Sequence, residues 1–235
     1  MMGVDVWERR GGGSEHGVVS VGKIGESLPL VSIAPIIPPS EVAAMDWDAL
    51  EQAVKECTAC PLHLTRTQGV FGVGDRAAQW FIVGEAPGED EDRQGEPFIG
   101  QAGQLLDQML GGIGLRRKEV YIANVLKSRP PGNRTPLVGE IASCGPYLER
   151  QIELVQPQII LATGAVAAQK LLASKTPIGL LRGRVYRYGT HRIPMVVTYH
   201  PSYLLRSPHE KRKAWDDLRL AWRVFHRVPP DGQDL

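Results

Sequence analysis

Short apolar runs recur along the chain, and glycine, proline or polar residues close each of them. The runs at 80–83, 120–125 and 158–162 carry no charge, which is typical of strands buried on both faces of a sheet. Two further runs, 184–188 and 193–198, lie close enough in the chain to pair as a hairpin.

Helical patterns separate these strands. Apolar residues recur every three or four positions over 105–113 and 137–155, which predicts helices that pack on a core. The Ala-rich stretch 165–173 is expected to be helical as well. Gly145 and Pro146 interrupt the second pattern, so we expect a bend or break there.

A helix is also expected at each end of the ordered region. Asp46 can cap one that runs to about Glu56. The last amphipathic helix is defined by four apolar residues, Trp215, Leu218, Trp222 and Phe225. Residues 1–45 mix glycine and proline without either period, so they are expected to form a flexible tail. The domain is then 46–227, and 228–235 form a second tail.

Alternating strands and helices predict an α/β fold in which helices cover both faces of a mostly parallel sheet. The carboxyl ends of parallel strands meet at one edge. The loops 84–92, 124–136 and 199–206 should therefore gather there, and they hold most of the unusual polar residues. Ligands of such sheets bind at that edge.

Length and composition narrow the class of protein. A chain of 235 residues can hold one sizeable core plus a tail. No apolar stretch approaches the roughly 18 to 20 residues of a membrane helix, and the start lacks a basic and then apolar signal. We therefore expect a soluble, cytoplasmic monomer with no membrane partner.

The net charge of +1 conceals an asymmetry. Residues 1–110 carry 7 basic and 17 acidic side chains, whereas residues 181–227 carry 11 basic and 3 acidic ones. The basic region suits contacts with phosphate groups of nucleic acid, although exposed lysine and arginine are also common on any solvated helix.

Glu85 is the most informative residue of the first strand-end loop. It directly follows the apolar run 80–83 and Gly84. A carboxylate that abuts a core strand is costly to bury, which favours a functional use. Glu89, Asp90 and Asp92 fit an ordinary solvated turn better.

Several separated motifs occur in one order along the chain: GEAPGEDED at 84–92, PFIG at 97–100, Asn124, RPPGNR at 129–134 and HPSYLLR at 200–206. Together they resemble the family 4 uracil-DNA glycosylases, and the resemblance extends from about Cys57 to Phe225. It implies a three-layer α/β/α fold around a mostly parallel four-stranded sheet. It also implies excision of uracil from DNA in base excision repair, and a [4Fe-4S] cluster held by four cysteines.

The expected chemistry can be matched to two residues. Cleavage of an N-glycosidic bond leaves cationic character on the sugar and negative charge on the base, so a site needs a carboxylate and hydrogen-bond donors on opposite sides. Glu85 would stabilise the sugar cation or position water, and His200 would donate to a uracil oxygen. A capping or core histidine is the alternative for His200.

The resemblance also implies a uracil-binding set, Ala86, Glu91, Phe98 and Asn124. A flipped base needs a stacking face and a reader of its edge. Phe98 can stack, and the Asn124 amide offers the acceptor and donor that a pyrimidine edge requires. Crowding near the base C5 position, from Glu91 or the backbone near Gly88, would exclude thymine. Phe98 and Asn124 could otherwise be a packing residue and a turn residue.

DNA contacts are implied for residues of the second and third loops. Leu204 or Leu205 could fill the gap that the flipped base leaves, and Arg206 could hold a phosphate. Both leucines could instead be core. The complete expected set is Arg129, Asn133, Arg134, Ser202, Leu204, Leu205 and Arg206.

Three cysteines, an odd number, argue against a disulfide framework. Cys57, Cys60 and Cys144 match three of the family's cluster ligands, and Ser128 stands where the fourth is expected. Serine oxygen is a poorer iron ligand than thiolate, so a labile cluster, a degraded one or none are the outcomes. Zinc is the second metal candidate, His63 is a conceivable nitrogen ligand, and Cys144 could be a core residue. The implied cluster is structural and lies away from the catalytic loop.

Two other functions are compatible with parts of the sequence. A catalytically weak relative could bind uracil or abasic DNA without turnover. Covalent trapping of DNA is disfavoured because residues 127–136 lack the basic, histidine-bearing insertion of the trapping family. An Fe-S electron carrier would explain the cysteines, but neither Asn124 nor His200.

Overall fold

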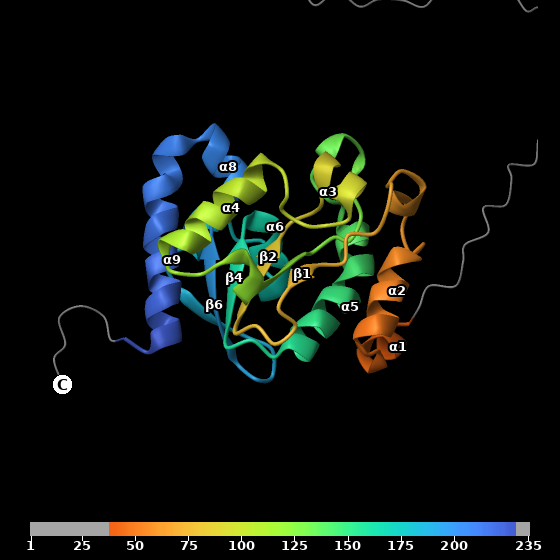
Figure 1. The fold of residues 1–235 in the computed structure, drawn as a ribbon, viewed down its shortest axis with the longest axis horizontal. Helices are drawn as coiled ribbons and strands as arrows, with labels where there is room; N and C mark the ends of the chain where they lie inside the picture. The colour runs from red at the N-terminus through yellow and green to blue at the C-terminus, as the bar shows by residue number, and fades with distance from the viewer. Residues whose placement is uncertain (1–37, 229–235) are drawn as a thin grey trace, which may run out of the picture. The chain divides into compact units, whose positions relative to one another are not determined.

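The computed structural model describes residues 38–228, in which a six-stranded sheet forms the centre (Figure 1). The strand order is β1-β3-β2-β4-β6-β5. β3, β2, β4 and β6 are parallel, while β1 and β5 pair antiparallel at the two edges. The expected four-stranded parallel sheet is thus the central part of a wider one. The strands are β1 (Val73–Gly74), β2 (Trp80–Gly84), β3 (Val120–Asn124), β4 (Ile159–Thr163), β5 (Val185–Tyr188) and β6 (Ile193–Thr198).

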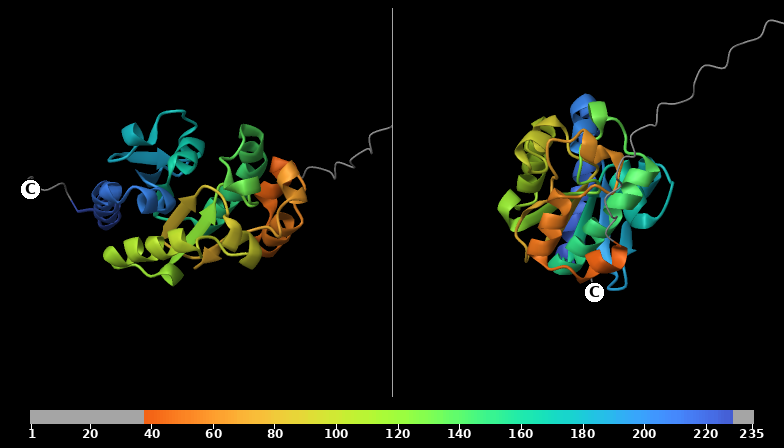
Figure 2. Two further views of the ribbon diagram at one scale, coloured as in Figure 1. Left: turned by 90° about the horizontal axis from the view of Figure 1, so that it is seen from above. Right: turned by 90° about the vertical axis from the view of Figure 1, so that its right-hand side faces the viewer.

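Helices cover both faces of the sheet, which confirms the three-layer α/β/α fold. α5, α6 and α7 pack on one face against Phe81, Ile160 and Val197. α4 and α9 pack on the other against Ile82, Leu161 and Val196. Figure 2 shows the green α5 and teal α6 across the sheet from the yellow-green α4. The α-helices are α1 (Pro39–Ala44), α2 (Trp47–Lys55), α3 (Glu89–Gln94), α4 (Gln101–Gly112), α5 (Val138–Val155), α6 (Ala165–Leu172), α7 (Ile178–Leu181), α8 (Pro201–Arg206) and α9 (Lys211–His226), and the 3₁₀ helices are η1 (Pro61–Leu64), η2 (Arg117–Glu119), η3 (Pro131–Asn133) and η4 (Pro208–Glu210).

The strand residues alternate between these two cores. Ile82 and Leu161 face α4 and α9, while their neighbours Phe81 and Ile160 face α5 and α6. Because side chains of a strand point to opposite faces in turn, a strand between two helical layers needs apolar residues at every position. This is why the sequence shows uninterrupted apolar runs there.

The domain begins earlier than the sequence predicts. Residues 39–44, inside the expected tail, form α1, and its Val42 is 1% exposed in a cluster with Leu50 of α2 and Tyr147 of α5. Asp46 caps α2 as expected, with Oδ1 accepting from Ala49 N at 2.9 Å. The remainder of the two predicted tails, 1–37 and 229–235, lies outside the described residues.

α5 continues through Pro146, so the expected break is absent. Gly145 has no Cβ to clash with the following proline ring, which helps the helix to continue. Two of the expected loops contain short α-helices, which the sequence did not predict. α3 begins at Glu89, where the run of acidic side chains complements the positive end of the helix dipole, and α8 begins with Pro201 at its first position.

The last helix is amphipathic as predicted, but two of its defining residues are only partly buried. Leu218 packs against the sheet, while Trp215 and Trp222 are 41% and 39% exposed. Within residues 38–228, none of the helices combines the length and apolar character needed to cross a membrane.

Candidate active site

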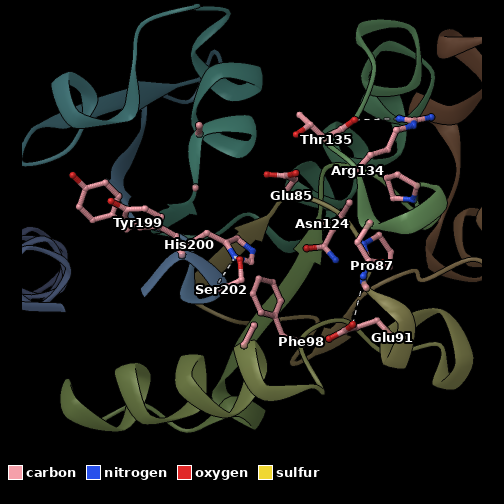
Figure 3. Close-up of a pocket in the computed structure, with 18 of the residues that line it drawn as sticks. Glu85, Pro87, Glu91, Phe98, Asn124, Arg134, Thr135, Tyr199, His200 and Ser202 are labelled. Carbon is pink, nitrogen blue, oxygen red and sulfur yellow. Dashed lines mark hydrogen bonds between the residues drawn. The ribbon is translucent and has the colours of Figure 1, made fainter. Parts of the chain in front are cut away.

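A cavity of about 710 Å³ opens at the edge where the parallel strands end. Residues at or after the ends of β2, β3, β4 and β6 contribute to its wall, namely Glu85, Asn124, Gly164 and His200. Other predicted site residues in the wall are Ala86, Glu91, Phe98, Asn133, Arg134, Ser202 and Arg206. In Figure 3 the side chains of Glu85, Asn124, Phe98 and His200 converge on the same space. The structure therefore brings together groups that are far apart in the sequence.

Glu85 is fixed at the first position after β2 by strand pairing. Its carbonyl oxygen accepts from Leu126 N at 3.0 Å, which continues the contact between β2 and β3 beyond their last residues. The side chain is half-buried in the cavity wall. Burial raises the pKa of the Glu85 carboxyl, and the positive charge of Arg206 opposes this rise. An incompletely solvated carboxylate of this kind is suited to stabilise a nearby cation.

His200 is the N-cap residue of α8, and this position determines which ring nitrogen carries the proton. Nδ1 accepts from Ser202 N at 3.1 Å and lies 2.8 Å from Ser202 Oγ. Burial, followed by the charge of Arg206, lowers the pKa of His200 to about 4. At neutral pH the imidazole is therefore neutral, and because Nδ1 is an acceptor, the proton lies on Nε2. Nε2–H is thus a hydrogen-bond donor.

The Phe98 ring stacks beside His200, with centroids 5.4 Å apart and planes inclined by 28°. The absence of a side chain at Gly84 makes room for this ring and for the side-chain amide of Asn124. A Cβ at Gly84 would lie 2.4 Å from the Phe98 ring and 2.2 Å from Asn124 Oδ1. Glycine at the strand end therefore allows both groups to reach the cavity.

Asn124 supplies an unused acceptor. The residue is 2% exposed, and its Oδ1 has no hydrogen-bond partner among the described residues. Most buried polar atoms are paired, because an unpaired one costs free energy. Asn124 lines the cavity, and an N–H group of a ligand bound there would satisfy Oδ1.

Glu91 also lines the cavity, but backbone hydrogen bonds occupy both of its oxygens. Oε1 accepts from Ile99 N at 3.0 Å and Gly100 N at 3.2 Å, and Oε2 accepts from Gly88 N at 3.1 Å. The carboxylate therefore joins the loop after β2 to the loop that carries Phe98. Exclusion of thymine by Glu91 stays a prediction.

A family model and individual relatives both match this chain, and they indicate the same family. Residues 71–219 match the model of the uracil DNA glycosylase superfamily. A type-4 uracil-DNA glycosylase of Archaeoglobus fulgidus is 43% identical over 190 residues, which cover 78% of this chain and 95% of that protein. One of Thermotoga maritima is 47% identical over 179 residues, which cover 74% and 92%. The chain belongs to the type-4 uracil-DNA glycosylase family. The resemblance noted in the motifs is thereby confirmed.

Two of the arginines expected to bind DNA in this family member are engaged in ion pairs. Arg134 donates to both carboxylate oxygens of Glu140, at 2.9 and 2.6 Å. Arg129 lies outside the cavity wall and contacts Asn133 Oδ1 at 2.7 Å and Glu89 at 3.2 Å. These contacts hold the loop 129–134 to α3 and α5. Their DNA contacts stay predictions.

The leucines of α8 differ sharply in exposure. Leu204 is 1% exposed and packs with Leu105 and Ala214, so the prediction that it could enter DNA is wrong. Leu205 is 40% exposed, and the exposed Arg206 follows it at the cavity wall. Ser202 hydrogen-bonds His200, and its contact with DNA stays a prediction.

The three cysteines lie near one another, and closer to the catalytic loop than expected. Cys60 and Cys144 share an apolar cluster with Ala86, the neighbour of Glu85 in the chain. Burial, together with the neighbouring thiols, raises the pKa of Cys144 to about 12. His63 Nδ1 lies 2.7 Å from the Cys60 carbonyl oxygen, which occupies that nitrogen.

Ser128 does not complete a cluster site. The residue is 4% exposed, and its Oγ accepts from Arg66 Nη1 at 2.8 Å. The same guanidinium donates to the carbonyl oxygens of Lys55 and Cys57. Within 38–228, no three His, Cys, Asp or Glu side chains are grouped so as to hold a metal ion. Three thiols and a hydroxyl already bound to arginine do not fit a four-thiolate cluster.

Gly164 is a site residue that the sequence analysis overlooked. Its φ is +93°, and a Cβ there would lie 3.0 Å from the Cβ of His200. Only glycine lets β4 end so close to the imidazole. A glycine directly after a buried strand was a usable signal. Tyr199, Tyr203 and Thr135, which also line the cavity, carry no comparable signal.

Proposed function

We propose that the cavity receives a uracil flipped out of DNA and that the site hydrolyses its N-glycosidic bond, leaving an abasic site. Membership of the type-4 uracil-DNA glycosylase family supports the reaction. The observation that carries the assignment of the site is the unpartnered, buried Asn124 Oδ1 at the wall. Uracil N3–H is a donor of this kind, and it becomes free only when the base leaves its pair in the duplex.

Recognition would combine stacking with hydrogen bonds to the base edge. The Phe98 ring gives one flat wall, and a pyrimidine can lie against it. Asn124 Oδ1 would accept from uracil N3–H, while the Asn124 amide NH₂ would donate to O4. Cytosine presents an unprotonated N3 and an amino group at those positions, so the same amide orientation would oppose it.

Bond cleavage would be driven by two groups that follow different strands of the sheet. The Glu85 carboxylate would stabilise positive charge on the sugar and orient the attacking water. His200 Nε2–H would donate a hydrogen bond to the uracil oxygen as negative charge builds on the base. Because the pKa of His200 is lowered to about 4, the imidazole would be neutral at neutral pH. The N–H group of a neutral imidazole is a very weak acid, so Nε2–H would donate a hydrogen bond without transferring its proton.

DNA would contact the protein through the mouth of the cavity. Leu205 is the exposed apolar side chain of α8 and would enter the base stack. Arg206, exposed beside it, would contact a phosphate. Asn133 and Arg134 border the cavity from the opposite loop and would approach the same strand.

We assign no step of the reaction to a metal or cluster. The three thiols of Cys57, Cys60 and Cys144 do not fit a four-thiolate cluster, and the Ser128 hydroxyl, which accepts a hydrogen bond from Arg66, would not replace the missing thiolate.

Release of free uracil tests the proposal directly. Purified protein is incubated with matched oligonucleotides that contain uracil or thymine, and free base and alkali-labile sites are measured. Asn124→Ala should lower kcat/KM by about tenfold to a hundredfold, because two buried hydrogen bonds to the base are lost. Gln108→Ala, which removes an exposed amide from α4, is the matched control and should have no effect.

The result also separates the enzyme from a binding-only relative. Release of uracil by the unmodified chain with full activity in Asn124→Ala would refute the role of Asn124 and leave the reaction intact. Tight binding of uracil-containing DNA without any released base would refute the reaction.

A further inference from the structure

Arg117 lies outside the cavity wall and contacts the loop 95–100, which joins α3 to α4 and carries Phe98. It begins η2, just before β3, and its guanidinium reaches two successive carbonyl groups. Nη1 donates to Phe98 O at 3.0 Å, and Nη2 donates to Pro97 O. Nη1 also lies 3.4 Å from Asp107. None of the motifs compared in the sequence includes this residue.

The conformation of Phe98 explains why such a contact matters. Its φ is +56°, in the left-handed region that a bulky residue seldom adopts. The loop is also tightly packed, because a Cβ at Gly103 would lie 1.8 Å from the Phe98 carbonyl oxygen. A backbone of this kind persists only when its surroundings hold it.

Charges of opposite sign hold the peptide groups on either side of this bend. Arg117 takes the carbonyl oxygens of Pro97 and Phe98, and Glu91 takes the N–H groups of Ile99 and Gly100. Hydrogen bonds to charged groups are stronger than those between neutral ones. Together they fix four consecutive residues, and with them the direction of the Phe98 ring.

We propose that Arg117 is a positioning residue for base excision: it sets the plane of the Phe98 ring against which the flipped base stacks. The inference rests on the proposed role of Phe98. The ring is stacked beside His200, so a shift of the loop would also alter the space between the aromatic wall and the Nε2–H donor. Arg117 would act without touching DNA.

The first experiment measures inhibition of excision by free uracil, together with kcat and KM. In Arg117→Gln we expect roughly tenfold weaker inhibition by uracil, because the stacking face is misplaced. kcat/KM should fall by about tenfold to a hundredfold, as for other small misplacements of a site group. Arg117→Lys, which retains one charged donor, should recover part of both.

Two variants provide matched controls. Arg116→Gln removes a neighbouring arginine that pairs at the surface with Glu119, and Asp107→Asn removes only the acidic partner of Arg117. Both should retain uracil inhibition and kcat/KM within about twofold, because exposed ion pairs contribute little. Thermal unfolding of every variant shows whether the assays report folded protein. If Arg117→Gln does not fold, Arg117→Lys carries the comparison.

A double-mutant cycle with Phe98→Ala decides between positioning and general support of the fold. If Arg117 acts through the ring, Arg117→Gln should cost nothing further once the ring is absent. Equal losses in both backgrounds, or unchanged uracil inhibition in Arg117→Gln, would overturn the inference. Full activity in Phe98→Ala alone would instead refute the stacking role in the proposed function.

Discussion

Replacement of Glu85 by glutamine keeps the size of the side chain and removes its charge. Glu85 is half-buried at the cavity wall, so an effective dielectric constant of about 20 is appropriate. For a sugar cation at about 4 Å, the lost attraction is about 4 kcal/mol. That corresponds to about a thousandfold decrease in kcat. We expect KM to change far less, because the charge on the sugar develops only as the bond breaks.

The assay is single-turnover release of uracil from an oligonucleotide, with Glu96→Gln as control because that carboxylate is exposed. The pH dependence adds a second test. Burial raises the pKa of Glu85, so the ionised form and the activity should be lost as pH falls through this raised value. In Glu85→Gln this acidic limb should be absent.

Glu85→Gln should lower the activity without lowering the unfolding temperature. Burial disfavours the charged form of Glu85 in the folded state, so the neutral glutamine should unfold at the same temperature or a higher one at pH 7. A loss of kcat below about tenfold would refute the electrostatic reasoning. A large loss accompanied by a lower unfolding temperature would indicate damage to the fold.

Three further predictions concern other parts of the site. Leu204→Ala should lower the free energy of unfolding, measured with denaturant, by about 2–5 kcal/mol, because Leu204 is buried. Leu205→Ala should change that free energy by less than about 0.5 kcal/mol. In kinetic assays Leu205→Ala should slow excision from duplex DNA more than from single strands. Ser128→Cys should raise the iron and sulfide content of anaerobically purified protein; equal content in both proteins would contradict this ligand argument. The NMR signals of His200 should not titrate near pH 6.5, because its pKa is lowered to about 4. The free energy of unfolding should fall as the pH is lowered from about 6.5 to about 4, because in this range His200 is protonated in the unfolded chain but not in the folded one.

The sequence was informative where one physical cause dominated. Strands between two helical layers must be apolar throughout, so 80–83 and 120–125 could be placed directly. The parallel arrangement then puts Glu85 and Asn124 at the same edge, as the structure confirms. His200 was predicted from its motif, but its place beside Phe98 depends on the loop between α3 and α4, which the strand order does not determine.

Other features depend on contacts that periodicity cannot reveal. The two-residue β1 is too short to show a pattern, and the acidic run at 89–92 was interpreted as a loop although it starts α3. Leu204 and Leu205 are adjacent apolar residues, and only the direction in which α8 packs decides which one is buried. The left-handed backbone of Phe98 and its contact with Arg117 require tertiary structure.

No single segment of this chain contains both of the proposed catalytic groups. Glu85 follows β2 and His200 follows β6, while β4 lies between those strands and is followed by Gly164. An incomplete sheet would therefore lack a complete site, so base release should report on completion of the whole domain during refolding. For the same reason, a chain divided between α6 and β5 should be inert as separate halves and regain excision only when the halves reassociate.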